Sequence, residues 1–147
     1  MLLDGFTAEE DRELHEVARV RTFAAGEALI REGTPGRSLF LIRSGIVEVV
    51  KDLKDTIYRH LKDFGPGEMI GELGFLGLPT RTASVVAKED CEAIEISAEV
   101  FAGLASRRPD IGMKVYRNIA IELADRLGKN TEELRRALLV ILNQMEV

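Results

Sequence analysis

Short alternating segments, interrupted by turn residues, fill positions 20–97 and restrict the chain to a β-rich core. Their Val, Ile and Phe content is typical of strands, and the clearest of them cover 38–43, 46–51, 69–70, 83–87 and 92–96. Ser44-Gly45 separates the first two segments and predicts a β-hairpin. Gly and Pro place further turns at 33–36 and 65–67. The spacing predicts an antiparallel jelly-roll β-barrel over about 20–97.

Helical signals flank this region on both sides. Thr7 and Glu10 form a capping box, which predicts a helix ending near Arg19. Ser97 can cap a second helix that runs to about 106, and Pro109 suits the first turn of a long third helix. The predicted fold is therefore mainly β with flanking α: one domain over 1–147, with an N-terminal helix and two C-terminal helices over about 98–146.

Within the long helix, Gly128 is expected to weaken the backbone. Residues 137–142 are apolar on every side, so a single buried stripe does not explain them. The segment could pack against its own barrel. It could instead meet a second copy of the chain, and a homodimer through this helix is the favoured reading.

Composition excludes several classes of function. The net charge is −5 and no dense Lys/Arg run is present, so no nucleic-acid partner is expected within this chain. Cys91 is the only cysteine, which rules out a disulfide framework and favours a packed structural thiol. No stretch reaches the ~18 apolar residues that a membrane span needs, and the start lacks a secretory signal pattern. A cytoplasmic location is expected.

The glycine-rich segment 71–83 contains the candidate binding residues. Glycines between two strands let backbone amides approach an anion, because no Cβ blocks the way. A helical turn over 73–76 would add its free amides. Arg81 offers a planar cationic fork suited to phosphate oxygens, and Glu72 can accept hydrogen bonds from a sugar hydroxyl. Together these residues suggest a clamp for a ribose phosphate, although an ordinary surface ion pair is the simpler alternative.

This segment resembles the phosphate-binding cassette of cyclic-nucleotide-binding domains, which the bacterial catabolite activator family, protein kinase A regulatory subunits and cyclic-nucleotide-gated channels share. The likeness extends to 23–27, 31–33, 36–42, 44–49 and 64–68. It implies a non-catalytic receptor for a 3′,5′-cyclic nucleotide that needs no cofactor and no metal. Ligand binding would reposition the long helix, and the effector protein or domain is not indicated.

The resemblance also implies roles for individual residues. Arg81 would hold the cyclic phosphate with the amides of Leu73, Gly74, Thr82 and Ala83. Glu72 and the Gly71 backbone would hold the ribose 2′-hydroxyl. The positions implied beside the base are Val49, Leu61, Thr82, Asn130 and Thr131.

Several alternatives stay open. Thr82 occupies the position where cGMP-preferring members of the family place a threonine, but bacterial cAMP receptors also use a hydroxyl there, and cAMP is favoured. Asn130 and Thr131 could equally be ordinary helix-surface residues. The chain could also be a fragment of a cyclic-nucleotide-responsive transcription regulator without its DNA-binding part.

A cupin-like metal enzyme would share a similar barrel and is the least favoured alternative. Such an enzyme needs clustered histidines and carboxylates around its metal. His15 and His60 are the only histidines, and neither has a carboxylate at recognisable ligand spacing, so both are expected to be surface or half-buried residues.

Overall fold

The computed structural model describes residues 1–54 and 57–145, without the side chains at 54, 133, 134, 137, 138 and 141–145. Within these residues, eight strands form two four-stranded antiparallel sheets, as the pattern over 20–97 predicts, although the barrel is not closed. One sheet has the order β1-β8-β3-β6, with bounds Arg19–Phe23, Cys91–Ser97, Ser38–Ser44 and Met69–Ile70. The other has the order β2-β7-β4-β5, with bounds Ala28–Ile30, Ser84–Ala87, Val47–Lys54 and Ile57–Phe64.

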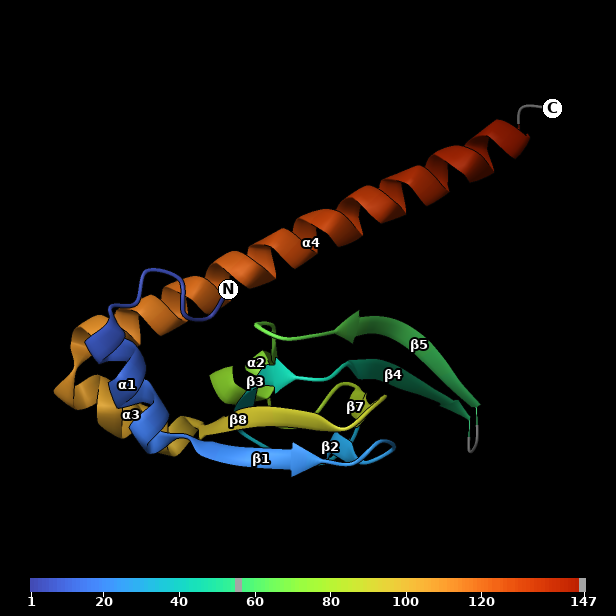
Figure 1. The fold of residues 1–147 in the computed structure, drawn as a ribbon. Coiled ribbons are helices and arrows are strands. Elements are labelled where there is room, and N and C mark those ends of the chain that lie inside the picture. Colours follow the sequence, from blue (N-terminus) through green and yellow to red (C-terminus); the bar gives the residue numbers. More distant parts are fainter. Residues whose placement is uncertain (55–56, 146–147) are drawn as a thin grey trace.

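The helices lie where the sequence predicts them. α1 covers Ala8–Val17 and begins with the Thr7–Glu10 capping box. α3 covers Ala98–Arg107 behind the Ser97 cap, and α4 runs unbroken over Pro109–Met145, passing through Gly128. α1 and α3 gather at the end of the sheets where α4 begins, and α4 then continues as a long rod (Figure 1).

Two apolar cores stabilise this arrangement, and β3 contributes to both because successive strand residues point to opposite faces. Phe40 and Ile42 face the space between the sheets, whose other buried residues are Phe23, Ile30, Val47, Phe64, Ile70, Val85, Ala87, Cys91 and Ala93. Leu39 and Leu41 face the helical layer, packing with Leu14, Phe101, Leu104, Ile111, Val115 and Ile119 among others. The first three turns of α4 are thus fixed to the sheet.

Asn118 pins the N-terminal segment to this part of α4. The side chain is buried, and its Nδ2 donates to the backbone oxygens of Leu2 and Asp4, both at 2.8 Å. Since an unpaired buried amide is costly, these two bonds satisfy a group that otherwise would not be tolerated in the core.

The hairpin predicted at Ser44-Gly45 is wrong. β3 pairs with β6 and β8, whereas β4 pairs with β5 and β7, so the two segments belong to different sheets. Gly45 has a φ of +83° and lies so close to Asp90 and Cys91 that a Cβ would collide with them. A turn does form at Gly45, as the sequence predicts, but it connects one sheet to the other. The hairpin partner of β4 is β5, a strand that the pattern analysis did not single out.

Cys91 is a packed thiol, as expected. Its Sγ lies 3.3 Å from the Ile46 oxygen and 3.0 Å from the Glu89 oxygen. Burial raises the pKa of this thiol, which disfavours the nucleophilic thiolate.

Candidate functional site

The segment after β6 folds as a tight turn and one short helix. Gly71 has a φ of +82°, and a Cβ there would lie 2.8 Å from the Ser38 oxygen, so only glycine fits this position. α2 follows over Glu72–Leu76 and includes the helical turn predicted at 73–76. This turn directs the start of α2 toward the space beside β4 and β5.

Arg81 is held in a slot beneath this turn. Only 9% of the residue is exposed, and its guanidinium donates to the Gly71 oxygen at 3.0 Å and to the Ser38 oxygen at 2.8 Å. Gly36 and Gly74 form the walls of the slot, since a Cβ on either would press against the guanidinium. Burial lowers the pKa of Arg81, and the charges of Glu72 and Glu95 oppose that shift. Arginine stays protonated under these conditions, so the slot holds a permanent cation.

Glu72 is 6% exposed and forms an ion pair with Arg126 of α4. Arg126 also donates from Nη2 to the Met69 oxygen at 3.2 Å, and its guanidinium lies 5.0 Å from the centre of the Phe64 ring. Its Nε is buried and has no hydrogen-bond partner among the described residues. Arg126 therefore connects α4 directly to the cassette.

These elements enclose a cavity of about 210 Å³. Its apolar wall consists of Ile30, Val49, Phe64, Ile70 and Val85. Its charged lining comprises three cations, Lys62, Arg81 and Arg126, and one carboxylate, Glu72. An excess of positive charge next to an apolar wall suits a ligand that combines an anionic group with a flat apolar one.

Most of the predicted site residues lie around this one cavity. They are Val49, Gly71, Glu72, Leu73, Gly74, Arg81, Thr82 and Ala83. They come from β4, α2 and the loop before β7, which converge although more than 30 positions separate Val49 from Ala83.

Leu61, Asn130 and Thr131 do not line the cavity. Leu61 is exposed, and its neighbour Lys62, opposite Val49 in the strand register, takes the place beside the cavity. Side chains alternate along a strand, so a shift of one residue reverses the face. Asn130 and Thr131 are exposed on α4, and the Thr131 hydroxyl donates to the Leu127 oxygen of its own helix.

Lys62 and Arg126 also line the cavity and were not predicted from the sequence. Arg126 lies one helical turn before Asn130, so the expected helix does reach the cavity, but it lines it with Arg126 one turn earlier. The available signal was a cation beside the apolar positions Leu123 and Leu127 of a helix that has to pass the cassette.

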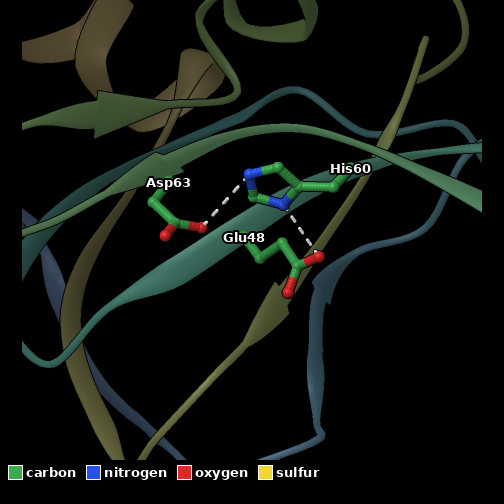
Figure 2. Close-up of side chains that lie close together, drawn as sticks. All are labelled: Glu48, His60 and Asp63. Carbon is green, nitrogen blue, oxygen red and sulfur yellow. Dashed lines mark hydrogen bonds and ion pairs between the residues drawn. The ribbon is translucent and has the colours of Figure 1, made fainter.

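The expectation that the histidines lack carboxylate neighbours is wrong. His15 Nδ1 lies 2.9 Å from Asp11 Oδ1, and His60 Nδ1 lies 2.9 Å from Glu48 Oε1. Figure 2 shows His60 between Glu48 and Asp63, with one carboxylate on each ring nitrogen. This cluster ties two strands together, and one ligand atom from each of its three residues lies within 4.8 Å of the others, close enough to hold a metal ion. Lys88 Nζ already lies 3.1 Å from Asp63 Oδ2, so its positive charge would compete with a metal at this place. The cluster lies on the outer part of the β4–β5 hairpin, apart from the cavity lining.

Comparison with known proteins identifies the cassette. The sequence profile described as "Cyclic nucleotide-binding domain" matches residues 20–108, from β1 through α3. The chain belongs to this family. The Thermus thermophilus protein named "Cyclic AMP receptor protein" is 34% identical over 134 residues, covering 90% of this chain and 60% of that protein. The crystal structure of Thermus thermophilus catabolite activator protein superimposes with a TM-score of 0.80 at 32% identity, covering 90% of this chain and 61% of the other.

Other relatives contain this region as a small part of a longer chain. "Glutaminase 1" of Bradyrhizobium diazoefficiens is 34% identical over 126 residues, which are 86% of this chain but only 20% of the glutaminase. The chain thus spans between a fifth and three fifths of these relatives. The match to the glutaminase concerns the cyclic-nucleotide-binding region and carries no enzymatic activity over to this chain. Within residues 1–54 and 57–145, no helix has the length and apolarity to cross a bilayer.

Proposed function

We propose that this domain is a non-catalytic sensor that binds a 3′,5′-cyclic nucleotide, preferably cAMP, in the cavity between α2 and the β4–β5 hairpin. The observation that carries the proposal is the convergence of buried Glu72 and buried Arg81 on one cavity that also has an apolar wall. A surface ion pair would not be buried in this way, and these two side chains bond other groups rather than each other.

Each part of the ligand has a matching surface. Arg81 and the amides of Leu73, Gly74, Thr82 and Ala83 would bind the phosphate, and Glu72 with the Gly71 backbone would bind the ribose. Val49 would contact the base across the apolar wall. Arg81 is well suited to its role because its charge is fixed before the ligand arrives and needs no rearrangement of solvent.

The preference for cAMP or cGMP depends on which side chains contact the edge of the base. The relative named for cyclic AMP supports cAMP. cGMP is the second candidate, because Thr82 and Lys62 both line the cavity, and lysine donates well to guanine O6 and N7.

The signal would leave the domain through α4. Arg126 of α4 is bonded to Glu72, a residue that the ligand would also engage, so ligand and helix compete for or share one carboxylate. A ligand that favours one position of α4 shifts the helix by its difference in affinity.

A homodimer through α4 is part of the proposal. Leu127, Leu139 and Val140 are exposed on this helix, which supports a second copy as its partner. The other side chains of the apolar segment, at 137, 138, 141 and 142, lie outside the described residues.

The effector that receives the signal would be another domain or protein. A reducing cytoplasm is the expected setting for a chain whose single cysteine is unpaired.

A thermal-shift and calorimetry panel tests the function. The protein is titrated with cAMP, cGMP, 5′-AMP and 5′-GMP. We expect the cyclic forms to raise the melting temperature by mass action, with cAMP stronger than cGMP, and the linear forms to act weakly. Equal responses to cyclic and linear nucleotides, or no response to either, would refute the proposal.

A further inference from the structure

Lys51 reaches from β4 to the end of the cassette. Its Nζ donates to the backbone oxygen of Thr82 at 2.8 Å. Neither residue forms a strand pair with the other: Lys51 is opposite Arg59 in the β4–β5 register, and Thr82 lies in the loop before β7. The side chain therefore makes a link that the sheet itself does not provide.

Glu32 holds Lys51 in place from the opposite side. Its Oε1 lies 2.5 Å from Lys51 Nζ, and its Oε2 accepts from the Asp52 amide at 3.3 Å. The Glu32 amide in turn donates to Ser84 Oγ at 2.9 Å, so the same residue contacts both β4 and the start of β7. The contact with Lys51 lowers the pKa of Glu32, which keeps the pair ionised near neutral pH.

The carbonyl group that Lys51 bonds belongs to the peptide group between Thr82 and Ala83. The Thr82 oxygen and the Ala83 N–H are the two ends of one peptide group, and this peptide bond is trans, since no cis bond occurs in the described part of the chain. In a trans peptide the carbonyl and the N–H point in opposite directions. A cation that holds the carbonyl toward β4 therefore fixes the opposite direction for the Ala83 N–H. Thr82 and Ala83 both line the cavity.

A cation on the carbonyl also polarises the peptide. Withdrawal of electron density from the oxygen makes the N–H a stronger donor, because hydrogen bonds in a chain reinforce one another. The Lys51–Thr82 contact would thus both orient and strengthen the Ala83 amide, which the proposed function assigns to the phosphate.

We infer that Lys51, supported by Glu32, is a positioning residue for the phosphate subsite, acting through the Thr82–Ala83 peptide without touching the ligand. This inference rests on the proposed function, since it concerns the anion end of the same cavity. It assigns a role to two residues outside the cavity lining.

The ion pair itself should matter little for folding. The Lys51 side chain is 47% exposed, and exposed pairs stabilise proteins weakly. The experiment can therefore separate a positioning role from a structural one. Loss of Lys51 should weaken ligand binding while leaving the ligand-free melting temperature unchanged.

The test uses Lys51→Met, Lys51→Arg and Glu32→Gln in the full chain, titrated calorimetrically with cAMP. Lys88→Met is the matched control, because Lys88 is 45% exposed, is paired with the carboxylate of Asp63 and lies outside the cavity lining. We expect Lys51→Met to weaken binding about 10-fold, Glu32→Gln to weaken it less, and Lys51→Arg and Lys88→Met to bind like the parent.

Nuclear magnetic resonance gives the second measurement. The Ala83 amide proton should move downfield when the parent binds cAMP, and this shift should shrink in Lys51→Met and return in Lys51→Arg. Unchanged affinity and an unchanged Ala83 shift in Lys51→Met would overturn the inference. If the parent binds no cyclic nucleotide at all, the proposed function fails instead, so the two failures are distinct.

Discussion

Arg126 of α4 and Glu72 of α2 form an ion pair across 54 positions of sequence, and this pair joins the candidate binding cavity to the helix that leaves the domain. The carboxylate is buried and has a further proposed role toward the ribose. The Glu72 side chain thus contacts the long helix and would also contact the ligand.

Removal of the Arg81 side chain should nearly abolish nucleotide binding. Arg81→Ala takes away the only guanidinium in the slot between Gly36 and Gly74 and leaves a buried phosphate without its charge partner. We expect calorimetry to show at least a ~10–100-fold weaker affinity for cAMP. Arg12→Ala, at an exposed pair on α1, is the control and should bind normally.

Arg81 also bonds two backbone oxygens, so its loss could disturb the fold. Arg81→Lys keeps the positive charge but lacks the planar guanidinium. We expect this variant to fold more like the parent than Arg81→Ala does, while its affinity for cAMP stays well below that of the parent. A well-folded Arg81→Ala protein that binds like the parent would contradict the assignment of this residue.

Glu72→Gln should reduce discrimination for the ribose hydroxyl. The parent is expected to bind cAMP about 10-fold more tightly than 2′-deoxy-cAMP, because the carboxylate accepts a charge-assisted hydrogen bond. In the variant the two ligands should bind with similar affinity. If the variant still prefers cAMP to 2′-deoxy-cAMP as strongly as the parent does, Glu72 does not recognise the ribose 2′-hydroxyl.

The same substitution should loosen α4. Without the carboxylate, Arg126 loses its ion pair with α2 and keeps only the pair with Glu122 of its own helix, at 3.5 Å. Ile111, Val115 and Ile119 still hold the first turns of the helix. Hydrogen exchange in the ligand-free variant should therefore rise after residue 119 and stay slow before it. Uniform exchange along the helix in both proteins would argue against the Arg126 link.

Stability should fall in mild acid because of Glu10. Its hydrogen bond to Lys114, with those to Thr7, holds the pKa of this carboxyl below the ordinary 4.5. A lowered pKa in the folded state adds stability that is fully present above the ordinary value and is lost as the pH falls through the folded-state pKa. The parent should be more stable than Glu10→Gln at neutral pH, and the two should converge in acid.

Denaturant unfolding at several pH values measures this convergence. Glu16→Gln on the same helix is the control, since Glu16 forms an exposed pair with Arg12. A constant difference between the parent and Glu10→Gln at every pH would show that the contribution is not ionic.

A charge at Leu127 should disrupt self-association. Leu127 is 67% exposed on α4, and a buried aspartate in an apolar helix contact would be unpaired. We expect Leu127→Asp to raise the dimer dissociation constant at least ~10-fold in sedimentation experiments. Val20→Asp places the same charge on exposed β1 and should leave association unchanged. A monomeric parent at all concentrations would exclude the dimer.

The sequence predicted much of this architecture because local signals decide it. The Thr7 and Ser97 caps, Pro109 and the alternating strand segments each act within a few residues, and those that were singled out appear where expected, whereas β5 was not singled out. The cassette was also predictable, since Gly71, Glu72 and Arg81 lie within one short segment whose glycines have a steric purpose.

Long-range relations were not predictable in this way. Nothing near Gly45 says whether the strands on either side share a sheet, because that depends on β7 and β8, about 40 positions later. The strand register decides whether Leu61 or Lys62 faces the cavity, and the path of α4 selects Arg126 over Asn130. Each depends on where a distant element packs.

The anchoring of α4 by Asn118 and its apolar neighbours gives the helix the mechanics of a lever with its fulcrum near Ile119. The remaining 26 residues to Met145 extend about 39 Å at 1.5 Å per residue. A tilt of about 10° at the fulcrum would displace the far end by about 7 Å. If ligand binding at Glu72 tilts the helix as proposed, a change of atomic size there would become a movement large enough for another molecule to detect.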